Sequence, residues 1–266
     1  MNNPRDDNPL DHHDQVVLVT GGTKGIGRGI AERYARAAAT VVVCGRSAPA
    51  GDTAGGAGDV AAGPAFLPCD VREPDQVAAM VDGVVERFGR LDVVVNNAGG
   101  APWADSATAS ARFNEKVIAL NLIAPFTVAQ AANRVMQDQP SGGAIVNIAS
   151  VSGIRPSPGT AAYGAAKAGL LNLTETLAVE WAPKVRVNAV VAGLIVTEQA
   201  HLFYGDEAAI GRVAATVPAG RLGTPDDIAG ACLFLSSRLA PFVSGAALRV
   251  HGGNERPAYL AAVTDG

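Results

Sequence analysis

Tyr163 and Lys167 are the residues whose types and spacing best suit proton exchange with a bound molecule. They are four positions apart in residues 161–181, a stretch that predicts a helix, so their side chains should share one face. A phenol has a pKa of about 10, and a neighbouring ammonium lowers it by stabilising the phenolate. Tyr163 could then act as a general acid in one direction and a general base in the other. A tyrosine and a lysine at this spacing are usually a surface packing pair, so other residues must support the hypothesis.

Ser150 and Asn121 are the candidates that would complete such a site. Ser150 ends a predicted strand thirteen residues before Tyr163, and its hydroxyl could donate a hydrogen bond to a substrate oxygen that gains charge. Ser152 competes for this role, but the spacing to Tyr163 favours Ser150, and Ser152 is assigned to the pocket wall. Asn121 lies inside a predicted helix at residues 110–139. Taken alone, each residue would usually be structural.

A glycine-rich turn lies between a predicted strand at residues 16–20 and a predicted helix at residues 26–38. It reads Thr20-Gly21-Gly22-Thr23-Lys24-Gly25-Ile26-Gly27. Glycines let the backbone turn tightly and approach a pyrophosphate, and the start of the helix offers free N–H groups and partial positive charge. Other turns also use glycine, but this position after the first strand favours a dinucleotide site.

The elements that must position these residues alternate between apolar strands and helices. Strands are predicted at residues 16–20, 40–44, 65–69, 91–95, 144–149, 185–191 and 246–250, and helices at residues 26–38, 74–88, 110–139, 161–181 and 224–236. Strands that are apolar on both faces indicate a parallel sheet covered on both sides. The predicted fold class is α/β: a single doubly wound, Rossmann-like domain with a mainly parallel sheet of about seven strands flanked by helices.

Two internal segments and the two chain ends depart from this alternation. Residues 45–64 read as a loop or a short, weak helix. Residues 195–218 are a long connection of the kind that often acts as a lid. We expect a disordered leader at residues 1–14, with His12 and His13 solvated, a catalytic domain at residues 15–254 and a tail at residues 255–266.

Composition limits the partners and the compartment. The net charge is −4 and the pI about 5.6, without a block of like charges, which argues against nucleic-acid or membrane partners. No apolar run reaches the roughly 18 residues of a membrane helix, and the polar start lacks the pattern of a secretion signal. Cys44, Cys69 and Cys232 have no metal-binding spacing and suit core positions. We therefore expect a cytoplasmic protein without a metal site.

Three motifs together resemble the short-chain dehydrogenase/reductase family, in its compact, non-extended branch. They are the glycine-rich turn, Asn96-Asn97-Ala98-Gly99, and Tyr163-x-x-x-Lys167 with Ser150 upstream. The resemblance runs from Val16 to Gly253. It implies an oxidoreductase that moves hydride between a nicotinamide cofactor and a carbon bearing oxygen, with Tyr163 as acid and base. It further implies that Lys167 holds the nicotinamide ribose, and that Asn121 bends its helix and holds a water connecting the lysine to solvent.

The resemblance also implies where the dinucleotide binds. The pyrophosphate would lie against Gly21, Thr23, Lys24, Gly25, Ile26 and Gly27. The adenosine would contact Asp70, Val71, Asn97, Ala98 and Gly99. The nicotinamide and its carboxamide would contact Gly193, Ile195 and Thr197.

Charges at the end of the second predicted strand bear on the choice of cofactor. NAD-preferring relatives have an acid there that binds the ribose 2′-hydroxyl, whereas this chain has Gly45 followed by Arg46 and Ser47. A carboxylate would repel a 2′-phosphate, and a guanidinium binds it. Lys24 adds a second positive charge. We therefore predict NADP(H), with NAD(H) as the alternative; the competing interpretation of both cations is solvated surface charge.

The wall of the substrate pocket is predicted to be mostly apolar. The candidates are Pro102, Trp103, Ser152, Ile154, Leu194 and Phe203, each of which also suits a core position. Such a wall favours a hydrophobic ketone or secondary alcohol over a sugar. The enzymatic alternative is a 3-oxoacyl-CoA reductase, because the helices flanking the site lack the basic residues that dock a carrier protein. The non-enzymatic alternative is an NADP(H)-binding sensor, which would not need the proton-exchange residues.

Three other features complete the sequence-based expectations. A Ser-His-Asp hydrolase is excluded because Ser150 has no Gly-x-Ser-x-Gly elbow. Ala192 stands where most relatives have proline, which should loosen the turn beneath the nicotinamide. His251 stands where relatives usually have aspartate, which would alter a subunit contact. The resemblance implies a homotetramer or homodimer, with residues 110–139 and 161–181 at one interface.

Overall fold

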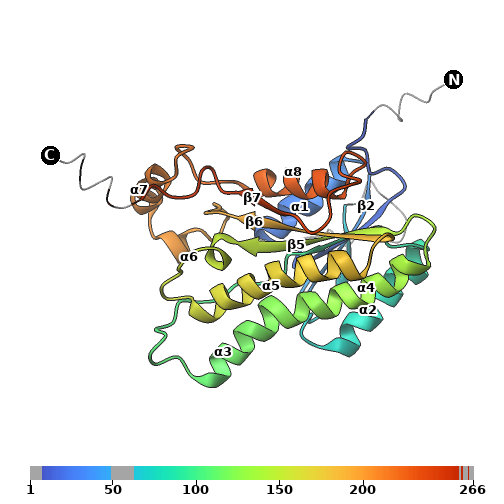
Figure 1. The fold of residues 1–266 in the computed structure, drawn as a ribbon, viewed down its shortest axis with the longest axis horizontal. Coiled ribbons are helices and arrows are strands. Elements are labelled where there is room, and N and C mark those ends of the chain that lie inside the picture. The colour runs from blue at the N-terminus through green and yellow to red at the C-terminus, as the bar shows by residue number, and fades with distance from the viewer. Residues whose placement is uncertain (1–7, 49–62, 258, 260–262, 264–266) are drawn as a thin grey trace.

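Seven parallel strands form the centre of the computed structural model, which describes residues 8–48, 63–257, 259 and 263 (Figure 1). The strands are β1 (Val16–Thr20), β2 (Thr40–Gly45), β3 (Ala65–Pro68), β4 (Val93–Asn96), β5 (Gly143–Ser150), β6 (Val185–Ala192) and β7 (Ala247–Val250). Their order across the sheet is β3-β2-β1-β4-β5-β6-β7, and every pairing is parallel. The predicted fold class is confirmed.

Helices cover both faces of the sheet. They are α1 (Gly25–Arg36), α2 (Pro74–Phe88), α3 (Ala111–Ile118), α4 (Ala124–Asp138), α5 (Ala161–Glu180), α6 (His201–Tyr204), α7 (Glu207–Thr216) and α8 (Pro225–Ser236). α2, α4 and α5 pack on one face and α1 and α8 on the other (Figure 1). α6 and α7 lie within the connection that was expected to form a lid.

The strands owe their position to β-branched residues that are buried on both sides. All five residues of β1 are buried, with Leu18 in the core beneath α2 and α4 and Val17 and Val19 in the core beneath α1 and α8. A strand of this kind must lie inside a covered parallel sheet. Cys44, Cys69 and Cys232 are free and buried, as expected for small core residues.

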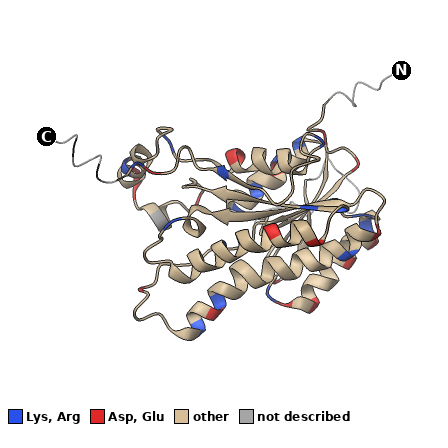
Figure 2. Ribbon diagram, viewed as in Figure 1, with Lys and Arg blue, Asp and Glu red and all other residues tan. Residues whose placement is uncertain are grey.

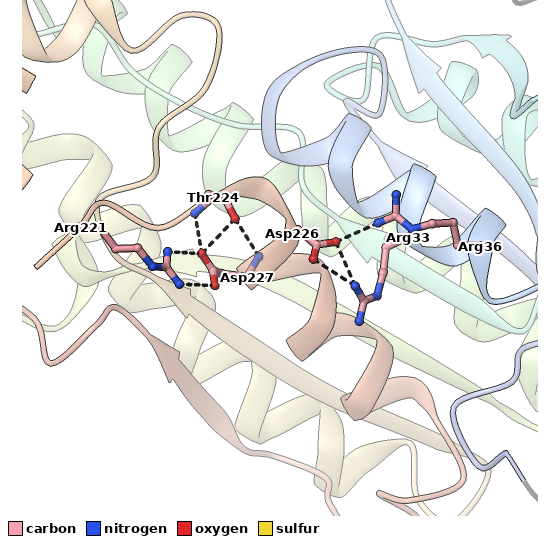
Figure 3. Close-up of polar contacts among 6 residues, drawn as sticks. All are labelled: Arg33, Arg36, Arg221, Thr224, Asp226 and Asp227. Atoms are coloured by element: carbon pink, nitrogen blue, oxygen red, sulfur yellow. Dashed lines mark hydrogen bonds and ion pairs between the residues drawn. The ribbon is translucent and has the colours of Figure 1, made fainter. Parts of the chain in front are cut away.

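α1 and α8 pack side by side, and the last turn of α1 is tied to the first turn of α8 (Figure 3). Arg33 and Arg36 of α1 both form ion pairs with Asp226, at 3.0 and 2.9 Å. The predicted start of α8 is confirmed as a capping box: Thr224 accepts from Asp227 N–H, and the Asp227 carboxylate accepts from Thr224 N–H.

The helical stretch predicted at residues 110–139 is confirmed, with a π-helix at Ala119–Ile123 between α3 and α4. The expectation for His12 is wrong. His12 is fully buried rather than solvated: its ring nitrogens bond Ser236 Oγ at 2.9 Å and the Leu10 carbonyl at 3.0 Å. The packed part of the chain thus begins before residue 15. Most of residues 45–64, read as a loop or weak helix, lies outside the described residues.

Charged residues of both signs are interspersed over the described part of the chain, without a large region of one sign (Figure 2). None of the described helices combines the length and apolar character needed to cross a membrane. Within the same residues, no three His, Cys, Asp or Glu side chains come together as a set of metal ligands.

Candidate active site

The candidate residues gather at the carboxyl ends of the central strands, where ligands bind in open α/β sheets. Thr20 ends β1, Asn96 ends β4, Ser150 ends β5 and Ala192 ends β6. These four strands are neighbours in the sheet. The topology alone therefore brings together segments that are far apart in the sequence.

The glycine-rich turn is braced by Asn97. Asn97 Nδ2 donates to the carbonyls of Thr20 at 3.0 Å and Gly21 at 3.2 Å, and Thr20 Oγ1 accepts from the N–H groups of Asn97 and Ala98, each at 3.0 Å. A Cβ on Gly27 would lie 2.3 Å from the Gly21 oxygen. Position 27 therefore requires glycine, and this close-packed cradle leads directly into the start of α1, the kind of helix end that binds phosphate groups.

The end of β2 brings together groups suited to a 2′-phosphate. Gly45 lies against Thr23 and Ser47: a Cβ at Gly45 would be 3.6 Å from Thr23 Oγ1 and 3.7 Å from the Ser47 oxygen. Arg46 is exposed, yet close enough to Asp70 to lower the pKa of its carboxyl. Arg72 has the larger effect, holding the pKa of Asp70 at about 2 through a side-chain hydrogen bond. Among the described residues that directly follow β2, at positions 46–48, none is acidic.

Tyr163, Ser150 and Lys167 meet beside the end of β5. The Lys167 ammonium lies 5.6 Å from the centroid of the Tyr163 ring and donates to the Ile148 carbonyl at 2.7 Å. Only 4% of Lys167 is exposed, and burial lowers its pKa to about 8. The Ser150 side chain is close enough to Tyr163 for its hydroxyl to act to lower the pKa of the phenol.

The net direction for Tyr163 differs from the expectation. Burial raises the pKa of Tyr163 above its ordinary value of 10.0 and outweighs the effect of the Ser150 hydroxyl. The net lowering of the Tyr163 pKa that was expected is therefore wrong. The physical reason is that removal from water disfavours the charged phenolate, while Lys167 directs its ammonium to a backbone carbonyl.

Asn121 sits in the π-helix and is fully buried. Its Oδ1 accepts from Gly100 N–H at 2.8 Å, while Nδ2 donates to the carbonyls of Gly100 at 3.0 Å and Val117 at 2.9 Å. A Cβ on Gly99 would lie 2.7 Å from Asn121 Oδ1 and 3.4 Å from Lys167 Nζ. Asn121 therefore braces the loop after β4 against the lysine, and both hydrogens of its amide are already used.

The residues predicted to contact the nicotinamide lie in the segment after β6. Gly193 packs so closely on His251 that an added Cβ would lie 2.7 Å from the His251 Cα. Ile195 is buried and forms a parallel bridge with Gly223. Thr197 approaches the other half of the site, since its methyl carbon would lie 3.7 Å from a Cβ on Gly25. The structure thus places Gly193, Ile195 and Thr197 along one path towards the glycine-rich turn.

The predicted substrate wall is only partly assembled. Ser152 N–H donates to Ser150 Oγ at 3.2 Å, so Ser152 is at the site. Trp103 is 74% exposed and packs on Gly159. A small cavity beside Tyr163 is lined by Pro102 and other residues of the loop after β4, by α3 and by the start of α5. Ile154 is exposed and Leu194 is partly buried, whereas the side chain of Phe203 lies outside the described residues.

Comparison with known proteins gives the family. Residues 21–255 match the family model described as enoyl-(acyl carrier protein) reductase. L-rhamnose 1-dehydrogenase (NAD(P)(+)) of Azotobacter vinelandii is 38% identical over 247 residues, which are 90% of this chain and 96% of that protein. D-threitol dehydrogenase of Mycolicibacterium smegmatis is 35% identical over 242 residues, 90% and 92% of the two chains. The chain belongs to the short-chain dehydrogenase/reductase family.

Solved structures of this family agree. Aldohexose dehydrogenase of Thermoplasma acidophilum superimposes with a TM-score of 0.83 at 32% identity, covering 91% of this chain and 94% of that one. A putative NAD(P)-dependent gluconate 5-dehydrogenase of Beutenbergia cavernae with bound NADP gives a TM-score of 0.84 at 34% identity, with 92% and 98% covered. This short-chain dehydrogenase/reductase is accordingly an NAD(P)-dependent oxidoreductase of alcohols or carbonyls.

Sequence reasoning about this dehydrogenase/reductase assigned no role to four residues around the site. The Glu198 carboxylate accepts from Gly25 N–H at 2.9 Å. Arg155, after β5, pairs with Glu255, after β7. Burial raises the pKa of Tyr204 and the charge of Glu255 acts in the same direction, which places Tyr204 near that pair. The one signal in the sequence was that these residues follow strands. That position does not show which residues from distant parts of the chain they contact.

Proposed function

We propose that this enzyme uses NADP(H) to interconvert a ketone and a secondary alcohol, with Tyr163 as the proton donor and acceptor. The observation that carries the proposal is the meeting of Tyr163, Ser150 and the buried Lys167 at the end of β5, beside the cradle at the end of β1. A protein that only binds a dinucleotide has no need to bury a lysine against a tyrosine.

The residues act as follows in the proposed reaction. The bound nicotinamide supplies or accepts the hydride. In reduction, the Tyr163 hydroxyl donates its proton to the carbonyl oxygen while Ser150 donates a hydrogen bond to the same oxygen. The raised pKa keeps Tyr163 protonated at neutral pH, which suits the acid role. In alcohol oxidation Tyr163 must lose its proton, and the Lys167 ammonium stabilises the phenolate.

NADP(H) is favoured by charge at the end of β2. Arg46 and Lys24 are both exposed cations near this corner, and Thr23 and Ser47 add polar atoms around Gly45. A 2′-phosphate would gain an ion pair from Arg46 there. An NAD-preferring site would need a carboxylate in the same place.

Three classes of alcohol or carbonyl substrate are to be distinguished by experiment. The apolar residues Trp103, Ile154 and Leu194 favour a hydrophobic ketone. A hydroxylated substrate is the second candidate, because Ser157 Oγ donates to Ser152 Oγ at 2.9 Å and pairs with Thr160 Oγ1 at 2.6 Å. Several relatives are named for sugars or polyols. A 3-oxoacyl-CoA is the third class to test.

A homotetramer or homodimer is proposed from family resemblance. Apolar side chains are exposed on the side of α8 and β7, with Phe242 fully exposed and Leu239 about half exposed. Ile123 and Val179 are exposed at the helices first expected to form an interface. Light scattering at micromolar concentration should show an oligomer, and a monomer would contradict the proposal.

The test of the proposed function is Tyr163→Phe. Phenylalanine keeps the ring and removes the proton, so turnover should fall by about a thousandfold or more, while the Kd for NADPH changes little. NADPH oxidation is measured with simple ketones, diketones, hydroxyketones and 3-oxoacyl-CoA compounds. Retained turnover in Tyr163→Phe would contradict the role of the tyrosine. Tight NADPH binding without turnover on any substrate would support the sensor instead.

A further inference from the structure

The amino-terminal end of α1 is held by an acidic side chain from a distant part of the chain. Glu198 Oε1 accepts from Gly25 N–H at 2.9 Å, although the two residues are 173 positions apart. α1 has no acid in its first turn, and its N-cap Lys24 makes no side-chain capping bond. Glu198 therefore supplies the negative charge that the positive end of a helix favours.

Glu198 is charged under ordinary conditions. Hydrogen bonds from its own backbone N–H and from Gly25 N–H lower the pKa of its carboxyl, and the positive charges of Arg28 and Lys24 act in the same direction. The contact thus places one full negative charge among the groups that give the glycine-rich turn its positive potential.

The cofactor's pyrophosphate is attracted by the same groups. It needs the free N–H groups at the start of α1 and the cations beside them. One of those N–H groups is taken by Glu198, and two anions in one small site repel each other. The carboxylate and the pyrophosphate therefore weaken each other's binding at the amino-terminal end of α1.

Glu198 also connects this site to the segment after β6. It follows Thr197, whose carbonyl accepts from Ala200 N–H at 2.9 Å, and α6 begins one residue later. A change in the position of Glu198 is therefore transmitted directly to the turn that precedes α6.

We propose that Glu198 competes with the cofactor's pyrophosphate for the amino-terminal end of α1, and that it thereby lowers the affinity of the enzyme for the dinucleotide and couples cofactor entry to the segment before α6. This rests on the cofactor site proposed above. The chemistry is a replacement of one anion by another and involves no covalent step. Glu198 acts as a positioning residue that sets the affinity and the release of the cofactor.

The experiment measures the Kd of two probes for the full chain and its variants by calorimetry. NADPH carries the pyrophosphate, whereas adenosine 2′-monophosphate carries the 2′-phosphate without it. Glu198→Gln keeps an oxygen that can accept from Gly25 N–H and removes the charge, so the fold should be preserved. Glu207→Gln, at an exposed position in α7, is the matched control.

For Glu198→Gln we expect the Kd of NADPH to fall by about threefold or more, as the loss of one charge beside a helix end predicts. The Kd of adenosine 2′-monophosphate should stay unchanged, as should both values in Glu207→Gln. Unchanged or weaker NADPH binding in Glu198→Gln would overturn the proposal. Equal tightening of both probes would also overturn it, because the effect would then be general. A wild-type enzyme that binds no dinucleotide would instead show that the cofactor site is wrong.

Discussion

Replacing Lys167 with methionine separates the chemical role of the ammonium from the cost of burying it. Lys167 is almost fully buried, and burial lowers the pKa of its ammonium from 10.5 to about 8. Its ammonium donates to the Ile148 carbonyl. Methionine resembles the aliphatic stem and has no charge, so Lys167→Met removes the buried charge and keeps most of the packing.

The sign of the effect follows from the lowered pKa. The stability that neutral Lys167 contributes is fully present above 10.5 and is lost as the pH falls through about 8. The difference between these two values corresponds to about 3 kcal/mol of unfolding free energy. Most of it changes between pH 10 and pH 7, where the folded group gains its proton and the unfolded group already has one. As the pH falls from 10 to 7, the unfolding free energy of Lys167→Met should therefore rise by about 2–3 kcal/mol relative to that of the wild type.

The assay is urea unfolding at pH 7, 8, 9 and 10, followed by tryptophan fluorescence at one protein concentration. Groups that titrate equally in both proteins cancel in the difference. Lys116→Met, at an exposed position in α3, is the control and should show no such pH dependence. NADPH-dependent turnover should be lost in Lys167→Met, because the phenolate and the nicotinamide ribose lose their cation.

A difference between Lys167→Met and the wild type that stays flat from pH 7 to pH 10 would refute the reasoning about burial. It would mean that Lys167 has the same pKa in the folded and unfolded chains. Normal turnover in the variant would separately contradict the role of Lys167 in the reaction. The two readouts are independent, since a lysine that is only structural would change stability and leave turnover intact.

Three further predictions concern the cofactor site and the core. Arg46→Asp should shift the ratio of kcat/KM for NADP(H) over NAD(H) towards NAD(H) by about tenfold or more, because a carboxylate repels the 2′-phosphate; an unchanged ratio would refute the role of Arg46. Gly27→Ala should abolish dinucleotide binding, because the added Cβ would lie 2.3 Å from the Gly21 oxygen. Gly83→Ala in α2 is the comparison: no atom lies within 4 Å of its added Cβ, so the free energy of unfolding should rise by about 1 kcal/mol in thermal unfolding. Burial lowers the pKa of His12 below 6.5, so the stability that the neutral imidazole contributes is present above pH 6.5 and is lost as the pH falls through the pKa of the folded state. Below pH 6.5, His12→Gln should therefore lose less unfolding free energy than the wild type, and equal losses in the two proteins would contradict this.

Local pattern was sufficient for the strands, for the close packing of the glycine-rich turn and for the proximity of Tyr163 and Lys167. Runs such as Val16–Thr20 are apolar on both faces, and only a covered parallel sheet buries both. The glycine-rich turn is recognisable because its glycines meet steric limits set by the turn itself, as the contact between Gly27 and the Gly21 oxygen shows. Tyr163 and Lys167 lie one helical turn apart, so their proximity depends on helix geometry alone.

Local pattern was insufficient wherever a contact joins distant segments. The burial of His12 depends on Ser236, which is 224 positions away, and nothing near His12 in the sequence indicates that partner. The π-helix at Asn121 has helical composition throughout, so its wider turn could not be distinguished from ordinary helix. The pKa of Tyr163 depends on the balance of burial against the effect of the Ser150 hydroxyl, and burial is a property of the whole fold.

The loop after β4 connects the proposed cofactor site to the proposed proton-exchange site. At its start, Asn97 and Ala98 donate to Thr20 Oγ1, which fixes the cradle at the end of β1. Two residues later, Gly100 exchanges two hydrogen bonds with Asn121, and the intervening glycine leaves no room for a side chain between Asn121 and Lys167. A displacement of this loop would therefore alter the position of the pyrophosphate cradle and the surroundings of the lysine together. Hydride transfer and proton transfer act on adjacent atoms of one substrate, so a short, hydrogen-bonded loop that connects both sites keeps their geometry matched.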